Sequence, residues 1–104
     1  MKSLRNPNRR PIHPGAILRE DVLPAIKLTQ GRLSELLGVS RLTVSQLLHE
    51  HRGLSPDIAM RLEKLLGNSA ESWLRMQEAV DLWEVRQQPA RFATIKRLPV
   101  TAST

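Results

Sequence analysis

The sequence predicts an all-α fold of five helices over residues 13–86, with a flexible basic arm at 1–12 and a flexible tail at 87–104. Two features of the sequence predict this class. Serine, threonine, proline and glycine stand where helices begin or end, and aliphatic residues recur at helical spacing between those points. The 104 residues, of which 40% are hydrophobic, suffice for one core and one domain.

The first expected helix begins at Pro14, because the first turn of a helix does not use the N–H that proline lacks. Its apolar face comprises Ile17, Leu18 and Val22. Pro24 lies within the same pattern, and a proline ring clashes with the carbonyl four residues earlier. We therefore expect this helix to end or bend near Leu23.

The next two helices are marked by polar caps and glycines. Thr29 and Ser40 each carry a hydroxyl that can accept a hydrogen bond from a first-turn N–H. Gly38 ends the first of these helices, since glycine takes left-handed conformations without strain, and Gly53 closes the segment of the second. Their apolar faces comprise Leu33, Leu36 and Leu37, and Val44, Leu47 and Leu48. The pattern predicts a helix, a short turn and a second helix.

The last two helices have strong boundary signals. Ser55-Pro56-Asp57 supplies a cap, a proline in the first turn and an acid near the helix N-terminus. Gly67 ends that helix, Ser69 caps the fifth, and Pro89 prevents the fifth from continuing far. Their apolar residues are Ile58, Ala59, Leu62, Leu65 and Leu66, then Trp73, Leu74, Met76, Val80 and Trp83.

The tail from Phe92 to Leu98 alternates weakly between apolar and polar residues and contains β-formers. A strand needs a pairing partner, and the rest of the chain offers none. We therefore expect a flexible tail. A short strand that pairs with another chain is the alternative.

The net charge of +6 is carried by the two ends of the chain. Residues 1–19 hold five basic residues and residues 85–104 hold four, and neither end holds an acid. Residues 20–84 hold seven basic and ten acidic residues. Such ends either keep a protein soluble or act as arms that become ordered on a phosphate backbone or an acidic protein surface.

Several classes of protein are disfavoured. The chain has no cysteine, and no long apolar run indicates a signal peptide or a membrane span, so we expect a cytoplasmic protein. His13 beside Pro14 is expected to be structural, and the pair His49 and His51 lacks a third metal ligand. No phosphate loop or nucleophile motif occurs, and the acids suit solvated helix faces. We therefore expect that the protein is not an enzyme and that it binds no metal or cofactor.

The segment from Leu28 to Leu47 carries the functional prediction. A tight turn around Gly38 sets two helices at a steep angle, and the second helix then projects a polar face. Glutamine can pair with adenine and arginine with guanine in the major groove of DNA. The candidate residues on this face are Ser40, Arg41, Thr43, Ser45 and Gln46. The pattern favours DNA binding, with a generic helical bundle as the alternative.

The same stretch resembles the Cro/cI (Xre-type) helix-turn-helix family, and more narrowly the chain resembles the HigA-type antitoxins of bacterial toxin–antitoxin operons. The similarity covers roughly residues 12–83. The residues that carry it are His13-Pro14-Gly15, Ile17-Leu18-Arg19-Glu20, Leu28-Thr29-Gln30, Leu36-Leu37-Gly38-Val39-Ser40, Arg52-Gly53-Leu54-Ser55, Ala59-Met60-Arg61-Leu62, Trp73-Leu74-Arg75-Met76-Gln77 and Asp81-Leu82. The combination of the His-Pro-Gly opening with the Trp-Leu-x-Met-Gln helix is fairly specific.

The resemblance implies a five-helix, lambda-repressor-like domain that dimerises, binds a palindromic operator and neutralises a toxin, usually a RelE-like ribosome-dependent endoribonuclease. It also implies that Ser40, Thr43 and Gln46 contact the operator and that Ser45 faces a phosphate. Gln30 matches a position that contacts the DNA backbone. A repressor without a toxin and a non-DNA helical adaptor remain the alternative functions.

Gly31 and Arg32 depart from the family, because its members often have a helix-favouring residue and an acid at these places. The second helix is therefore weakly specified. Gln46 stands where an arginine would be unsurprising, so the preferred base can differ from that of relatives.

The two tryptophans predict a packing and an association surface. Trp73 and Trp83 are ten residues apart, which places them on different parts of one helix. We expect Trp73 to pack on the domain. Trp83, with Met76 and Val80, is expected at a homodimer interface, where buried aromatic anchors are common. Two core tryptophans in a loosely packed end are the alternative.

Overall fold

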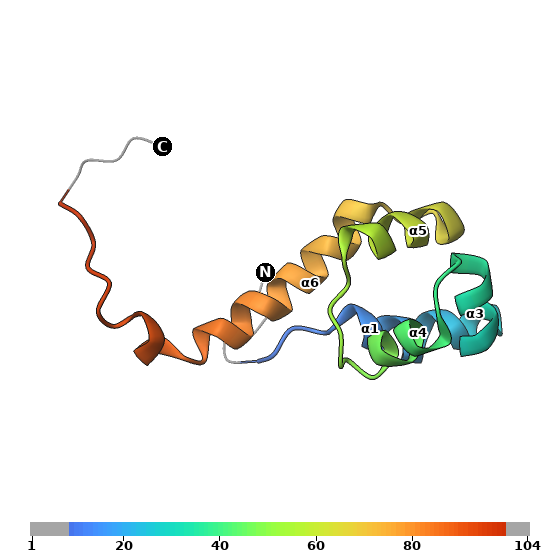
Figure 1. Cartoon of the computed structure of the whole chain (residues 1–104), viewed down its shortest axis with the longest axis horizontal. Coiled ribbons are helices and arrows are strands. Elements are labelled where there is room, and N and C mark those ends of the chain that lie inside the picture. Colours follow the sequence, from blue (N-terminus) through green and yellow to red (C-terminus); the bar gives the residue numbers. More distant parts are fainter. Residues whose placement is uncertain (1–8, 100–104) are drawn as a thin grey trace, which may run out of the picture.

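The computed structural model describes residues 9–99, which fold into helices joined by short turns (Figure 1). The elements are α1 (Pro14–Ile17), the π-helical turn η1 (Leu18–Val22), α2 (Leu23–Ile26), α3 (Gln30–Leu37), α4 (Arg41–Leu48), α5 (Pro56–Leu66), α6 (Ala70–Arg86) and the 3-10 turn η2 (Pro89–Phe92). Because α1, η1 and α2 run on without a break, the described residues form five helical segments. They contain no strand, so the all-α, five-helix prediction is confirmed.

Of the two outcomes expected at Pro24, an end or a bend of the first helix, the structure excludes the end, because the helix continues through a π-helical turn. The amide of Leu23 donates to the carbonyl of Leu18, five residues earlier, which is the hydrogen bond of a π-helix. This wider turn directly precedes Pro24, where a regular helix would press the proline ring against the carbonyl of Glu20. The segment ends only at Lys27, whose φ is 55°.

The predicted caps of the two central helices are present. The Thr29 hydroxyl accepts a hydrogen bond from the amide of Arg32 at 3.1 Å, and the Ser40 hydroxyl accepts one from the amide of Thr43 at 3.0 Å. Gly38 ends α3 with a φ of 72°. The remaining hydroxyl caps are Ser55 on α5 and Ser69 on α6. These local signals therefore fix where four helices begin.

The end of α4 differs from the prediction, because the helix stops at Leu48, well before Gly53. Glu50 takes the left-handed conformation in this loop, with a φ of 62°. Gly53 has a different role further along. Its missing Cβ leaves room for Gln77, whose side-chain amide would lie 3.3 Å from an added methyl group.

The core is aliphatic, as the low aromatic content implies. Leu18, Leu33, Leu47 and Leu62, from four different segments, are each at most 1% exposed. Trp73 is 2% exposed and belongs to the same cluster, which confirms that it packs on the domain. The long α6 contacts α5 and α1 and extends beyond the other helices, as Figure 1 shows.

The backbones of α1 and α4 approach each other closely at Gly15. A Cβ built on Gly15 would lie 1.9 Å from the carbonyl oxygen of Leu47, a distance that no side chain can occupy. The imidazole Nδ1 of His13 accepts a hydrogen bond from the amide of Gly15 at 2.9 Å and caps α1. The His-Pro-Gly opening thus has a physical role: it caps α1 and lets it lie directly on α4.

Both expected flexible ends lie partly outside the described residues, namely 1–8 of the arm and 100–104 of the tail. In the described part of the arm, Arg10 forms ion pairs with Glu50 and Glu84. The tail contains η2 and then runs on as irregular backbone to residue 99, so residues 92–98 form no strand in the single chain. Between residues 9 and 99, no helix is both long and apolar enough to cross a membrane.

Candidate DNA-binding surface

The candidate surface is built by α3, the turn at Gly38 and α4. Gly38 and the Ser40 cap make the turn short, and α3 packs on α4. The inner face of α4 is buried through Val44, Leu47 and Leu48. Its opposite face is open to solvent and carries the predicted residues. Of these, Ser40 and Arg41 are exposed, and Thr43, Ser45 and Gln46 are half-buried.

Ser40 and Thr43 form a fixed pair at the start of α4. Their hydroxyl oxygens lie 2.8 Å apart, and the Ser40 hydroxyl also accepts from the Thr43 amide. Each hydroxyl can still offer a further donor or acceptor. The structure therefore presents two small, oriented polar groups at the helix end that would enter a groove first.

Arg41 extends over the first turn of α3. A Cβ at Gly31 would lie 3.3 Å from Nη2 of Arg41, so the guanidinium uses the space that glycine leaves open. Gln30, the first residue of α3, is exposed beside it. The sequence predicts that Gly31 weakens this helix. In the structure, its missing side chain leaves room for the guanidinium of Arg41.

Gln46 is held by Arg52, which is not among the predicted site residues. Its Oε1 accepts hydrogen bonds from Nε of Arg52 at 3.1 Å and from Nη2 of Arg52 at 2.9 Å. Arg52 lies in the loop after α4. These two side chains are six positions apart and meet because the chain reverses at Glu50. Helical spacing therefore does not predict this contact.

Leu42 is a further candidate that is not among the predicted site residues. It is 64% exposed and lies between Arg41 and Thr43 on α4. Such a side chain can contact the methyl group of thymine. Apolar character at position 42, between two predicted contact residues, is the signal that could have identified it.

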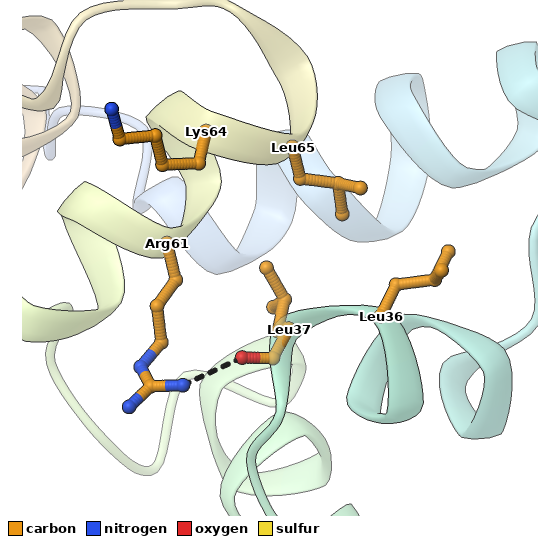
Figure 2. A pocket seen from close by; sticks show the side chains of 5 residues that line it. All are labelled: Leu36, Leu37, Arg61, Lys64 and Leu65. Carbon is orange, nitrogen blue, oxygen red and sulfur yellow. Dashed lines mark hydrogen bonds between the residues drawn. The ribbon is translucent and has the colours of Figure 1, made fainter.

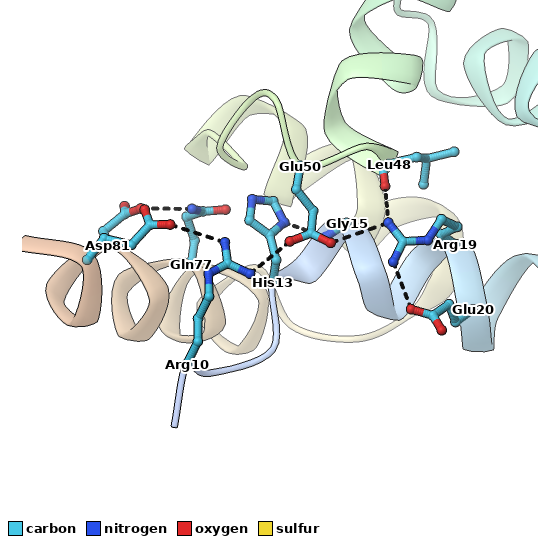
Figure 3. A network of polar contacts seen from close by, with 10 residues as sticks. Arg10, His13, Gly15, Arg19, Glu20, Leu48, Glu50, Gln77 and Asp81 are labelled. Carbon is cyan, nitrogen blue, oxygen red and sulfur yellow. Dashed lines mark hydrogen bonds and ion pairs between the residues drawn. The ribbon is translucent and has the colours of Figure 1, made fainter. Parts of the chain in front are cut away.

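An ion-pair network fixes the end of α4 to the rest of the domain (Figure 3). Glu50 lies 2.9 Å from Nη1 of Arg10 and 3.4 Å from Nη1 of Arg19. Arg19 also donates to the carbonyl oxygen of Leu48, the last residue of α4, at 2.6 Å. The hydrogen bond from Arg10 holds the pKa of Glu50 below its ordinary value, although burial opposes this shift. The acid closest in sequence to the candidate face is thus neutralised by neighbours.

A second arginine fixes the end of α3, as Figure 2 shows. Nη1 of Arg61 on α5 donates to the carbonyl oxygen of Leu37 at 2.8 Å, and its Nε donates to Asp57 at 2.9 Å. The carbonyls at a helix C-terminus lack partners within the helix, so this contact satisfies one of them. A hollow of 270 Å³ beside Arg61 is lined by Leu36 and Leu65 among others.

The predicted association residues lie along α6. Met76 and Trp83 line a groove of 1030 Å³ between this helix and residues 9–12, together with the exposed Ile12 and Leu82. Nε1 of Trp83 is buried without a hydrogen-bond partner. Val80 is only 1% exposed inside the protomer, so it offers almost no surface to a second chain.

The histidines after α4 do not form a metal site with their neighbours. The ring centroids of His49 and His51 are 6.2 Å apart, and residues 9–99 contain no cluster of three potential metal ligands. Nδ1 of His49 lies 2.8 Å from the carbonyl oxygen of Ser45, and because a carbonyl only accepts, Nδ1 carries the hydrogen.

Comparisons with known proteins agree with this architecture. The helix-turn-helix family model matches residues 18–73. Antitoxin HigA-1 of Vibrio cholerae is 39% identical over 92 residues, which are 86% of this chain and 87% of that protein. The HTH-type transcriptional regulator YbaQ of Escherichia coli is 35% identical over 99 residues, 95% of this chain and 88% of that protein.

Solved structures show the same relationship. Antitoxin GraA in complex with its operator superposes with a TM-score of 0.81 at 38% identity, over 94% of this chain and 100% of that one. Fold, motif and sequence therefore agree along nearly the whole chain. The chain belongs to the Xre-type helix-turn-helix family and, within it, to the HigA-type antitoxins.

Proposed function

We propose that this protein is an antitoxin and a sequence-specific autorepressor, which binds its own operator and neutralises a RelE-like, mRNA-cleaving toxin. The observation that carries the DNA-binding part is the solvent-facing polar side of α4, held at a fixed angle by the turn at Gly38. GraA shares this fold and is described with its operator bound. A protein with this function acts in the cytoplasm.

In this proposal α4 enters the major groove of double-stranded DNA. Ser40, Thr43, Gln46 and Arg41 contact base edges, since hydroxyl, amide and guanidinium groups match the donors and acceptors exposed there. Ser45 and Gln30 contact phosphates, where the N-terminus of α3 adds favourable N–H groups. Leu42 adds an apolar contact. The basic ends contribute attraction that weakens with salt.

Two protomers associate through α6, with Met76 and Trp83 at the interface. A symmetric dimer places two α4 helices about 34 Å apart, one turn of DNA, on a palindromic operator. Trp83 supports this assignment because it lines the groove and is only partly buried within the protomer, which leaves part of its ring available to a second chain. Val80 then supports the interface from within the protomer.

Binding of the toxin changes the amount of antitoxin that is free to occupy the operator, which gives autoregulation. The toxin is expected to meet the basic ends or the tail, through charge or by strand pairing. This step depends on the family relationship and on the charge of the ends.

The first test combines two experiments on the tagged full chain. A pull-down from the native host should recover a small toxin protein, and a shift assay on the chain's own promoter DNA should show binding that weakens with salt. The double variant Thr43→Ala, Gln46→Ala should lose base preference and keep its fold. Unchanged selectivity would refute the assignment of the reading face.

A repressor without a toxin is the second candidate, because the polar face of α4 can serve DNA binding whether or not the chain also binds a toxin. A promoter shift without a recovered partner would support that function. A partner without a shift would mean that the helix-turn-helix serves protein contact, as in an adaptor.

A further inference from the structure

The contact between Gln46 and Arg52 limits what Gln46 can recognise. An arginine side chain carries only donors, so the Gln46 atom that faces it must be the carbonyl oxygen Oε1. That oxygen accepts from both Nε and Nη2 of Arg52, at 3.1 and 2.9 Å. An amide oxygen has two lone pairs, and this contact occupies both. The Nε2 group, with two N–H donors, is left for DNA.

Adenine and the other bases make different demands on a glutamine. The bidentate pair with adenine needs the amide oxygen to accept from N6 while the amide nitrogen donates to N7. Guanine presents two acceptors, N7 and O6, and thymine presents the acceptor O4. A glutamine that offers only donors therefore matches guanine or thymine and loses one of the two hydrogen bonds that adenine requires.

The loop that carries Arg52 is anchored, which fixes the backbone from which this side chain reaches Gln46. Two residues later, the amide of Leu54 donates to Oε1 of Gln77 at 2.8 Å, and Gln77 is 7% exposed. Nε2 of Gln77 in turn donates to Asp81 on the same helix at 2.9 Å. Gly53 lies against this amide without a side chain of its own. The loop is thereby fixed to α6 directly beside Arg52.

We propose that Arg52 is a positioning residue that sets base specificity: it occupies the oxygen of Gln46 and presents the amide N–H groups to base acceptors, guanine N7 and O6 or thymine O4. This inference rests on the proposed operator binding and deepens it. Arg52 acts through Gln46. Its effect is on the ratio of affinities between bases at one position of each half-site.

The test measures fluorescence anisotropy of the full chain on a panel of duplexes at one salt concentration. The panel contains the promoter operator with every half-site base pair replaced by each of the other three. The position contacted by Gln46 is the one where Gln46→Ala loses discrimination. There the unmodified chain should bind guanine or thymine about tenfold more tightly than adenine, which is the discrimination expected of one good side-chain contact.

Three variants separate positioning from charge. Arg52→Ala should raise the relative affinity for adenine at this position several-fold, because the freed oxygen can accept from N6. Arg52→Lys, which keeps a donor for the oxygen, should largely retain the original preference. Arg91→Ala removes a cation from the tail and serves as the matched control, and it should weaken all duplexes by the same factor.

The panel itself distinguishes guanine from thymine, and 7-deazaguanine, which lacks the N7 acceptor, should reduce binding only if guanine is the partner. A preference of the unmodified chain for adenine, or an unchanged base ratio in Arg52→Ala, would overturn the inference and leave operator binding intact. If the unmodified chain bound no operator duplex better than a scrambled one, the proposed function would fail and the inference with it.

Discussion

At the scale of single residues, the molecule depends on two glycines for opposite reasons. Gly15 lies where any Cβ would overlap the Leu47 carbonyl at 1.9 Å, and that atom is backbone and cannot move aside. A Cβ added at Gly31 would lie 3.3 Å from Nη2 at the end of the Arg41 side chain, and this flexible side chain can move. Glycine is therefore required for the packing of α1 on α4, whereas in α3 it only leaves space for a side chain that could lie elsewhere.

We expect Gly15→Ala to destabilise the fold by about 3 kcal/mol or more, because α1 must move away from α4 and the core opens. Gly31→Ala is the matched control. It should be neutral or stabilise by up to about 0.5–1 kcal/mol, since alanine favours the helix. Urea denaturation of both variants checks this, and equal effects would contradict the packing argument.

His13 gives the protein a defined dependence on pH. Burial lowers the pKa of His13 below its ordinary value of 6.5, because the charged ring loses water, and nearby Glu50 only partly opposes this. The cap to Gly15 also requires an unprotonated Nδ1. A lowered pKa means that the unfolded chain binds more protons. Stability is therefore full above pH 6.5 and declines as pH falls below that value.

His13→Asn should remove this decline, because asparagine caps a helix equally well and does not titrate. Denaturant midpoints at pH 7.5 and 5.5 should differ for the natural chain and nearly coincide for the variant. The pKa of Glu50 is lowered from 4.5, so its contribution is lost only at lower pH and leaves this comparison intact. A variant that still weakened at pH 5.5 would assign the effect to another group.

At the scale of elements, helix boundaries could be predicted wherever their cause is local. Thr29, Ser40, Ser55 and Ser69 cap with their own hydroxyls, and each cap is visible in the sequence. The end of α4 was mispredicted because its cause is distant: Glu50 adopts a left-handed turn that Arg10 and Arg19 hold through ion pairs. The π-helical turn before Pro24 could not be predicted either, because the spacing of apolar residues gives no sign of it.

The candidate site divides in the same way. The polar face of α4 could be predicted, since helical spacing decides which side chains share a side. The contact that orients Gln46 could not be predicted, because the path of the loop brings Arg52 to Gln46. That path is held by the hydrogen bond between Gln77 of α6 and the loop. The loop from 49 to 55 is therefore the element on which the site most depends.

The loop anchor predicts a measurable loss. Gln77→Met keeps the approximate size of the side chain but removes the acceptor for the buried amide of Leu54. We expect destabilisation of about 1–3 kcal/mol, the usual effect of an unsatisfied buried donor. Gln88→Met, at an exposed residue just beyond the same helix, should change little. Thermal melting of both variants checks the difference, and equal melting temperatures would refute a role for the anchor.

At the scale of the whole molecule, the candidate DNA-binding face of α4 and the groove along α6 occupy different parts of the domain. In Figure 1, α4 belongs to the compact group of helices, whereas much of α6 extends away from it. The groove at Met76 and Trp83 lies along α6. One chain can therefore bind a second protomer through α6 while α4 stays accessible. The groove is lined by four arginines and one acid, Glu78, so a contact between two copies would rest on its apolar residues rather than on paired charges.

The dimer prediction follows from this arrangement. Leu82 lines the groove and is 43% exposed, so Leu82→Glu should place a charge in the interface without disturbing the core. The variant should sediment as a monomer at concentrations where the natural chain is a dimer. Its operator affinity should fall at least about tenfold, because only one of two half-sites is then held by each protein. Met60→Glu, at a residue 45% exposed on α5 and outside both surfaces, should leave both properties as they are. A dimeric Leu82→Glu protein would move the interface elsewhere and separate the groove from DNA binding.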